Sequence, residues 1–171
     1  MAFYCSHIAM HTIEENENVM IYGPVIMNAE VLCYKSDLAD VRTVGISQGR
    51  QNEKEQARET YPQIEEFQEI TQKGILYSLE NGQVDGVVQD ISKAANVPDY
   101  LCAPISETDY ISYVLVVDKK FVKTEEFGEF IENYNRAAES LNDPEVLAGK
   151  LGVEEDWLKD KKIRFLTLGH P

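Results

Sequence analysis

Short apolar runs alternate with polar, helix-forming stretches along the first two thirds of the chain. The runs predict strands over residues 3–5, 19–22, 24–35, 41–47, 84–89, 101–105 and 110–117. Between them the pattern predicts four helices. The first covers residues 6–15 with Ser6 as its cap, the second runs from the Gly49 turn to the residue before Pro62, the third is capped by Thr71 and stops at the Asn81-Gly82 pair, and the fourth covers residues 91–96. Residues 64–70 fit a strand or a helix. This alternation predicts an α/β fold in which a mixed sheet, mostly parallel with an antiparallel strand, is flanked by helices.

The final third of the chain carries a helical pattern instead. Apolar residues spaced three and four apart predict a long helix over residues 124–141. Asp143 followed by Pro144 predicts the start of a second helix, which Gly152 ends. A short helix around Trp157 and a last strand over residues 163–168 complete the prediction.

The charge of the chain excludes several classes of partner. Its 171 residues are enough to bury a core, and they carry 30 acidic against 16 basic side chains, a net charge of −14. Contacts to nucleic acid or to an anionic membrane surface need clustered Lys and Arg, so neither partner is expected. No apolar run approaches the ~18 residues of a membrane span. The N-terminus also has no basic segment followed by an apolar one, so the sequence as written predicts a cytoplasmic protein without a signal peptide.

The cysteines and the motif search give little support for catalysis. Cys5, Cys33 and Cys102 form no Cys-x-x-Cys pair and no disulfide framework, so buried thiols that pack as small apolar side chains are expected. The sequence has no Gly-x-Ser-x-Gly motif and no phosphate-binding loop, and no enzyme activity or cofactor is predicted. If the chain were catalytic, Cys5 with His7 would be the only candidate nucleophile pair.

Cys5, His7 and His11 form the one metal-like cluster in the sequence. The two histidines are four residues apart and would share one side of a helix, with two glutamates nearby. A thiolate, two imidazoles and a carboxylate could bind zinc or a similar metal, so a metal-binding protein is one alternative. The stretch matches no specific zinc motif, so a structural role for these residues is the other.

The leading candidate for a binding site is the turn after the fourth predicted strand. Ser47 and Gln48 offer side-chain donors, Gly49 allows close approach of the backbone, and Arg50 could pair with an anion through two hydrogen bonds. The helix that starts beside Gln51 adds main-chain N–H groups and the positive end of its dipole. This arrangement suits a small anionic or polar solute; the alternative is an ordinary strand-to-helix turn with a solvated arginine.

Gln89 and Asp90 end the next predicted parallel strand. They are expected on the same rim as the turn, because ligands of open α/β sheets bind at the carboxyl ends of the strands. Asp90 would suit an amine or hydroxyl group of the solute, or it caps the helix that follows. The sequence therefore predicts one ligand site built from two neighbouring strand ends.

Three stretches follow one another in a characteristic order. Residues 30–46 are EVLCYKSDLADVRTVGI, residues 79–88 are LENGQVDGVV, and residues 113–121 are YVLVVDKKF. In order and spacing they resemble the type II solute-binding proteins of ABC transporters, nearest the nitrate, sulfonate and taurine class. In that family the first stretch leads into the ligand loop, the second joins a helix to a strand, and the third is the return strand before the C-terminal helices.

The resemblance implies a two-lobed binding protein that closes by a hinge around a small anionic or polar solute and docks on an ABC permease. Residues 25–121 would be lobe two in full, and residues 1–24 and 122–171 would be remnants of a lobe one that lacks most of its length. Ser6 and His7 would then face the solute from a strand-to-helix junction of lobe one.

Two further expectations come from the resemblance. A shortened lobe one would leave apolar surface uncovered, so a homodimer or a companion chain is expected. If the reading frame is interrupted, the full-length protein would be exported and tethered outside the cytoplasmic membrane. An intracellular ligand-sensing or interaction domain on the same fold is the alternative.

Overall fold

The computed structural model describes residues 1–97 and 99–169. It divides into two compact units: a first unit of Met1–Ala29 with Asp109–Pro171, and a second unit of Glu30–Thr108. The chain therefore passes between the units twice, after Ala29 and after Thr108. No helix within the described residues is both long enough and apolar enough to cross a membrane.

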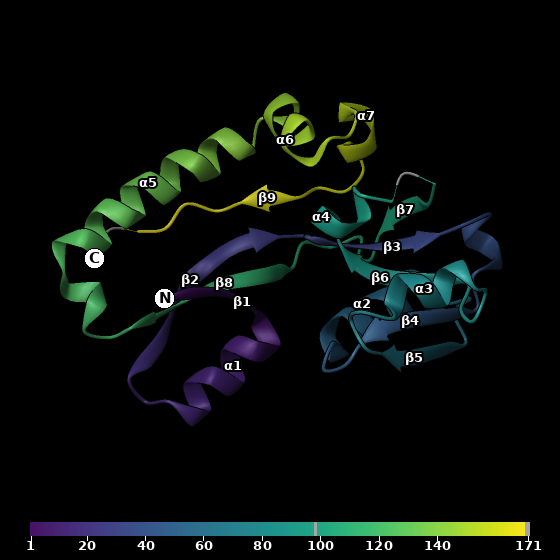
Figure 1. Ribbon diagram of the computed structural model, residues 1–171, viewed down its shortest axis with the longest axis horizontal. Helices are drawn as coiled ribbons and strands as arrows, with labels where there is room; N and C mark the ends of the chain where they lie inside the picture. The colour runs from purple at the N-terminus through teal and green to yellow at the C-terminus, as the bar shows by residue number, and fades with distance from the viewer. Residues whose placement is uncertain (98, 170–171) are drawn as a thin grey trace. The chain divides into compact units, whose positions relative to one another are not determined.

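The first unit is built on an antiparallel sheet of four strands in the order β1-β8-β2-β9. The strands are β1 (Ala2–Cys5), β2 (Val19–Met27), β8 (Ile111–Asp118) and β9 (Arg164–Phe165), and the two longest helices are α1 (Ser6–Glu15) and α5 (Glu125–Leu141). Leu115 and Val117 of β8 belong to the core beneath α5. Val114 and Val116 alternate with them and pack around Ala9 of α1. Figure 1 shows the two helices on opposite sides of this sheet.

Local capping signals set the ends of the C-terminal helices. After the 3₁₀ turn η2 (Phe121–Lys123), the hydroxyl of Thr124 accepts a hydrogen bond from a main-chain N–H in the first turn of α5. Asp143 caps α6 (Pro144–Leu151) in the same way, and the helix ends at Gly152, whose φ of 72° favours glycine. The short helix α7 (Glu155–Leu158) follows. The predicted helices are confirmed, whereas the last strand is limited to β9 rather than residues 163–168.

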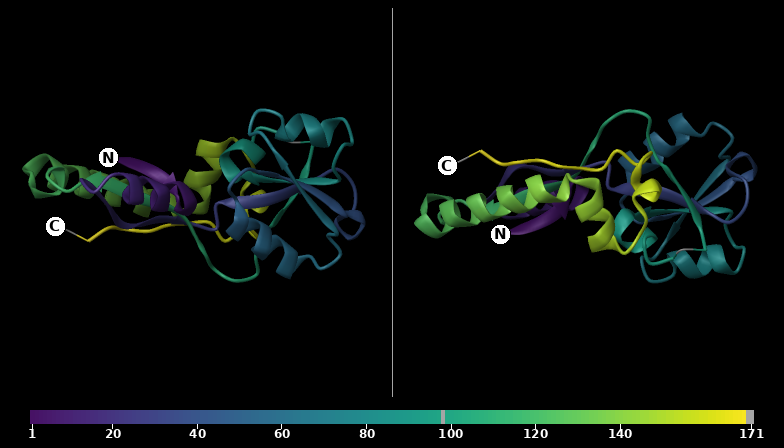
Figure 2. Two further views of the ribbon diagram at one scale, coloured as in Figure 1. Left: turned by 90° about the horizontal axis from the view of Figure 1, so that it is seen from below. Right: turned by 90° about the horizontal axis from the view of Figure 1, so that it is seen from above.

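The second unit contains a mixed sheet of five strands in the order β5-β4-β6-β3-β7. The strands are β3 (Glu30–Tyr34), β4 (Thr43–Ser47), β5 (Glu66–Ile70), β6 (Gly86–Asp90) and β7 (Leu101–Pro104). The helices are α2 (Gln51–Thr60), α3 (Ile75–Glu80) and α4 (Ile91–Ala94), with a 3₁₀ turn η1 (Leu38–Asp40). Figure 2 shows α2 and α3 on opposite sides of the sheet. The buried core residues of this unit include Val44, Ile46, Ile75, Leu79 and Val87.

The directions of the strands in the second unit agree with the prediction. The α/β fold with a mixed sheet flanked by helices is confirmed, and the ambiguous residues 64–70 contain strand β5. Parallel pairing joins β4 to β5 and β6, whereas β3 runs antiparallel to β6 and β7. Because β6 and β7 both run antiparallel to β3, strands β4, β5, β6 and β7 share one direction and β3 is the single antiparallel strand, as predicted.

Asn28 divides the segment that the sequence predicted as one strand over residues 24–35. Its φ is 57°, in the left-handed region, and β2 ends before it while β3 begins at Glu30. The side-chain amide of Asn28 donates to the Asp109 carboxylate and to the Lys162 carbonyl, both at 2.9 Å, and its oxygen accepts from Tyr110 N–H at 3.0 Å. The break therefore separates the two units at Ala29. The second unit spans residues 30–108, whereas lobe two was expected over residues 25–121. Val25 lies in β2 and Phe121 in the 3₁₀ turn that follows β8, and both belong to the first unit.

Two expected helix caps are also wrong. Cys5 occupies the position before α1, and Ser6 instead donates its hydroxyl proton to the Ile111 carbonyl at 3.1 Å. Gly74, not Thr71, precedes α3, and no side chain caps that helix. Both errors come from tertiary or turn contacts that outweigh the intrinsic preference of serine and threonine for the cap position.

Several large apolar side chains of the first unit are exposed, namely Met1, Phe3, Ile8, Met10 and Ile111. Apart from Met1, which precedes β1, they belong to β1, α1 and β8, and β1 is an edge strand of its sheet. The homodimer or companion chain expected from the sequence stays a prediction.

The hydroxyl of Tyr134 links α5 to the sheet of the first unit and makes its stability sensitive to high pH. It donates toward the carbonyls of Leu166 at 2.8 Å and Val25 at 3.1 Å, and burial raises the pKa of Tyr134 to about 12. Between the ordinary pKa of about 10 and this raised value, the folded state binds more protons than the unfolded state. The free energy of unfolding should therefore fall as the pH rises through this range.

We expect Tyr134→Phe to remove the stabilisation that the Tyr134 hydroxyl gives to the first unit, together with its dependence on pH. The variant should be less stable than the wild type by about 1 kcal/mol near neutral pH, and the difference should shrink between pH 10 and 12. Urea unfolding followed by the fluorescence of Trp157, the single tryptophan, measures the effect in the first unit. Tyr4→Phe is the matched control, because Tyr4 belongs to the same unit and is only partly buried. Parallel loss of stability with pH in the wild type and Tyr134→Phe would contradict the assignment.

Candidate functional site

The predicted strand ends meet at one edge of the second unit's sheet. Ser47 ends β4, Gln89 and Asp90 end β6, and these two strands are parallel neighbours. Glu30 begins β3 and lies opposite Asp90 in the antiparallel register. A recess forms here, lined by Glu30, Ile46, Ser47, Arg50, Gln72, Val88, Gln89, Asp90 and Lys93. Its volume of about 20 Å³ holds about one water-sized group.

The turn between β4 and α2 has the predicted form. Gly49 has a φ of 74°, which a residue with a Cβ rarely adopts, and α2 begins at Gln51 immediately after the turn. Gln48 is exposed, and the side chain of Gln51 donates to the Glu55 carboxylate at 2.8 Å along the helix. Of the turn's side chains, Ser47 and Arg50 line the recess.

Arg50 pairs with two carboxylates of the chain. Its Nη1 lies 3.1 Å from Oε1 of Glu30 and 2.7 Å from Oε1 of Glu53. The side chains of Glu30, Arg50 and Glu53 are 2%, 19% and 12% exposed. Burial of Glu30 in the sheet requires a positive partner, because an uncompensated buried carboxylate is strongly unfavourable. The structure gives Arg50 this internal role, and its predicted contact with a ligand anion stays a prediction.

Neutral polar side chains form a hydrogen-bonded chain across the recess. Ser47 donates its hydroxyl proton to the Gln72 side-chain oxygen at 2.9 Å, and the Gln72 amide donates to the Gln89 side-chain oxygen at 3.3 Å. Gln89 is 2% exposed, so its amide is held rigidly beneath the surface. Donors and acceptors fixed in this way can orient a polar solute with little loss of side-chain entropy.

Asp90 and Lys93 complete the rim from α4. The Asp90 carboxylate accepts a hydrogen bond from Ser92 N–H at 2.9 Å and so caps α4, one of its two predicted roles. Lys93 is exposed on the same short helix. Three carboxylates, those of Glu30, Glu53 and Asp90, and two cations, Arg50 and Lys93, surround the recess. Their charges add up to −1. The local charge therefore does not favour a simple anion.

Sequence reasoning missed four residues of this site, namely Glu30, Glu53, Gln72 and Lys93. Gln72 follows the end of β5, and the rule that ligands gather at strand ends could have found it. Lys93 lies three residues after Asp90 and could have been placed by the same rule. Nothing in the local sequence marks Glu30, because its partner Arg50 is twenty residues away.

The candidate residues Cys5, Ser6, His7 and His11 belong to the first unit. Cys5 is buried at the end of β1, whereas His7 and His11 are exposed on α1 with their ring centroids 4.6 Å apart. Within residues 1–97 and 99–169, no group of three or more His, Cys, Asp or Glu side chains is arranged to bind a metal ion. The expected contact of Ser6 and His7 with a solute stays a prediction.

A second pocket lies among the C-terminal helices of the first unit. It has a volume of about 340 Å³ and is lined mainly by apolar side chains, among them Leu141, Leu147, Leu158 and Ile163. Asn142 also lines it. Its side-chain amide donates to the Phe165 carbonyl and accepts from the Phe165 N–H, both at 2.8 Å. Glu155, Lys159 and Lys162 also line the pocket, so it combines an apolar lining with charged side chains.

No protein-family model and no curated protein matches the sequence. Solved structures match the fold instead. The chain is similar to an ABC transporter from Parabacteroides distasonis, with a TM-score of 0.68 and 11% identity over 97% of this chain and 68% of that chain. The fold is that of periplasmic solute-binding proteins.

Two further neighbours share the solute-binding fold. The alkanesulfonate-binding protein SsuA from Xanthomonas axonopodis pv. citri, bound to MOPS, has a TM-score of 0.62 and 11% identity over 98% of this chain and 68% of its own. The ligand-binding component of an ABC-type import system from Staphylococcus aureus, with zinc bound, has a TM-score of 0.61 and 12% identity over 98% of this chain and 67% of its own. At such identities the likeness shows the fold and leaves the solute open. The predicted truncation of lobe one stays a prediction.

Proposed function

We propose that the chain binds a small polar solute at the recess beside β4 and β6, without catalysis, as the binding component of an ABC importer. The observation that carries the proposal is the convergence of Ser47, Gln72, Gln89, Asp90 and Lys93 at one sheet edge. One neighbour that shares this fold is described as the ligand-binding component of an ABC-type import system, and another as an alkanesulfonate-binding protein. In this role the chain would deliver its solute to a permease outside the cytoplasmic membrane.

The charges of the recess support a particular kind of solute. Arg50 is compensated by Glu30 and Glu53, so Lys93 is the cation best placed to meet an anionic group. Asp90 and the amides of Gln72 and Gln89 can meet an amine or a hydroxyl group. A solute with an amine and an anionic group, or with several hydroxyls, matches this set better than nitrate or sulfate does.

A thermal-shift screen tests the proposal. Taurine, α-amino acids and small polyols would be compared with nitrate, sulfate and alkanesulfonates, and hits would be titrated by calorimetry. A solute at 100 times its Kd stabilises the folded state by about 2.7 kcal/mol, which raises the Tm by roughly 5–10 °C in a chain of this size. If no compound of the first group shifts the Tm while a simple anion does, the polar-solute assignment fails.

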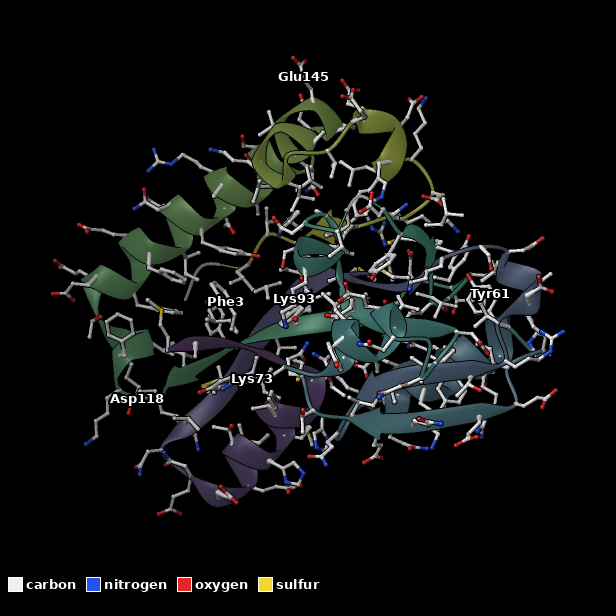
Figure 3. All side chains as sticks on the ribbon, turned by 45° about the vertical axis from the view of Figure 1, so that its right-hand side comes forward. Phe3, Tyr61, Lys73, Lys93, Asp118 and Glu145 are labelled. Atoms are coloured by element: carbon white, nitrogen blue, oxygen red, sulfur yellow. The ribbon has the colours of Figure 1, made fainter. Side chains whose placement is uncertain are left out.

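We expect Lys93→Ala to weaken binding of a zwitterionic hit by roughly 10–100-fold, because a charged hydrogen bond contributes about 1.5–3 kcal/mol. The Tm without solute should not change, because Lys93 is exposed. Lys73→Ala is the matched control, since Lys73 is exposed in the same unit but does not line the recess (Figure 3). Equal weakening by both variants would indicate a general charge effect and contradict the site.

A further inference from the structure

Two cysteines that are far apart in the sequence face each other in the second unit. Cys33 lies in the middle of β3, and Cys102 lies directly opposite it on the antiparallel edge strand β7. Their sulfur atoms are 2.8 Å apart and share a hydrogen bond. Cys33 is completely buried, whereas Cys102 is partly exposed. The expectation of cysteines acting only as small apolar side chains does not account for this pair.

We propose that Cys33 and Cys102 are a redox-active pair that closes to a disulfide between β3 and β7. Directly opposed residues of antiparallel strands have Cβ atoms roughly 4.5–5.5 Å apart, and a disulfide needs about 3.5–4.5 Å. The sulfur atoms must approach from 2.8 Å to about 2.05 Å. Closure therefore requires a movement of about an ångström, with the strand register unchanged.

The difference in burial assigns the order of the chemical steps. The thiolate of Cys102, the accessible partner, attacks a small-molecule disulfide such as oxidised glutathione, forms a mixed disulfide and releases one glutathione thiolate. The thiolate of Cys33 then attacks the Cys102 sulfur and releases the second glutathione. The protein loses two electrons and two protons, and the glutathione disulfide is reduced to two thiols. Excess dithiothreitol reverses the exchange.

The disulfide would fasten an edge strand. β7 pairs with β3 on one side only, so its main chain depends on that single neighbour. The cross-link would also close a loop that contains β4, β5 and β6 together with α2 and α3, and long closed loops restrict the unfolded chain strongly. The oxidised second unit should therefore resist unfolding better than the reduced one.

Thiol counting with the purified chain tests the proposal. After oxidised glutathione and removal of the reagent, the denatured wild type should keep one of its three thiols, and peptide mapping should find Cys33 joined to Cys102. The Tm of the oxidised protein should exceed that of the reduced protein by roughly 4–16 °C. Cys5→Ser is the control and should still lose two thiols.

Variants of the pair separate the two steps. Cys33→Ala, which keeps the buried position apolar, should stop at a mixed disulfide on Cys102, and Cys102→Ser should form no disulfide within the chain. The proposal is overturned if the wild type also stops at the mixed disulfide on Cys102 or forms only cross-links between chains. It is equally overturned if oxidation leaves the Tm unchanged or lowers it. None of these readouts depends on solute binding.

Discussion

Replacing Arg50 with methionine should lower the free energy of unfolding by about 3–5 kcal/mol, because it leaves a buried carboxylate without its partner. Glu30 is 2% exposed and cannot regain water unless β3 separates from the sheet, and Glu53, 12% exposed, loses its cation in the same variant. A surface ion pair would cost far less, so the size of the effect reports how deeply the pair is buried.

Urea unfolding followed by far-UV circular dichroism measures this loss, since that signal includes the second unit. With a slope of about 1–3 kcal/mol per molar urea, the midpoint should fall by roughly 1–5 M. Adding Glu30→Gln to Arg50→Met should restore part of the loss by removing the buried charge. Lys159→Met, which breaks an exposed pair with Asp156, is the control and should leave the midpoint unchanged. A loss for Arg50→Met no larger than for this control would contradict the burial of the pair.

Phe127→Ala should destabilise the first unit by about 3–5 kcal/mol, the cost of removing a fully buried aromatic side chain. Phe127 is 0% exposed, and its ring lies 4.9 Å from that of Tyr22 and 5.6 Å from that of Phe121, measured between centroids. Both contacts have the edge-to-face geometry that aromatic pairs favour. The substitution therefore leaves a cavity between α5 and β2.

The fluorescence of Trp157 follows this unfolding, because Trp157 belongs to the first unit. Phe3→Ala is the matched control: it removes the same side chain from a position that is 49% exposed (Figure 3), and it should cost less than about 1 kcal/mol. Phe127→Leu should give an intermediate loss. Similar midpoints for Phe127→Ala and Phe3→Ala would show that the core beneath α5 is not closed around this ring.

Local chemistry explains which features could be predicted from the sequence. Thr124 and Asp143 cap the helices that follow them, as predicted, because each cap is completed within three residues. The strand, the glycine turn and the helix around Gly49 were predicted for the same reason. The meeting of Ser47 with Gln89 followed from one general rule about parallel strands and is confirmed as an arrangement; binding of a solute there stays a prediction.

The features that were missed depend on partners far along the chain. Asn28 breaks a continuous apolar run through contacts with Asp109, Tyr110 and Lys162, more than eighty residues away. Arg50 looked available to a ligand because its carboxylate partner in β3 is remote in sequence. The pairing of Cys33 with Cys102 depends on the register of β3 and β7, which no local pattern records.

The compensated Arg50 leaves the rest of the turn open to redesign. Gly49 must stay glycine because of its φ of 74°, and the ion pairs of Arg50 must stay because β3 depends on them. Gln48, Gln72 and Lys93 are exposed and carry no buried charge. A combinatorial library confined to those three positions would vary the chemistry of the rim while the scaffold stays intact, which makes this edge of the sheet a practical starting point for a biosensor with altered selectivity.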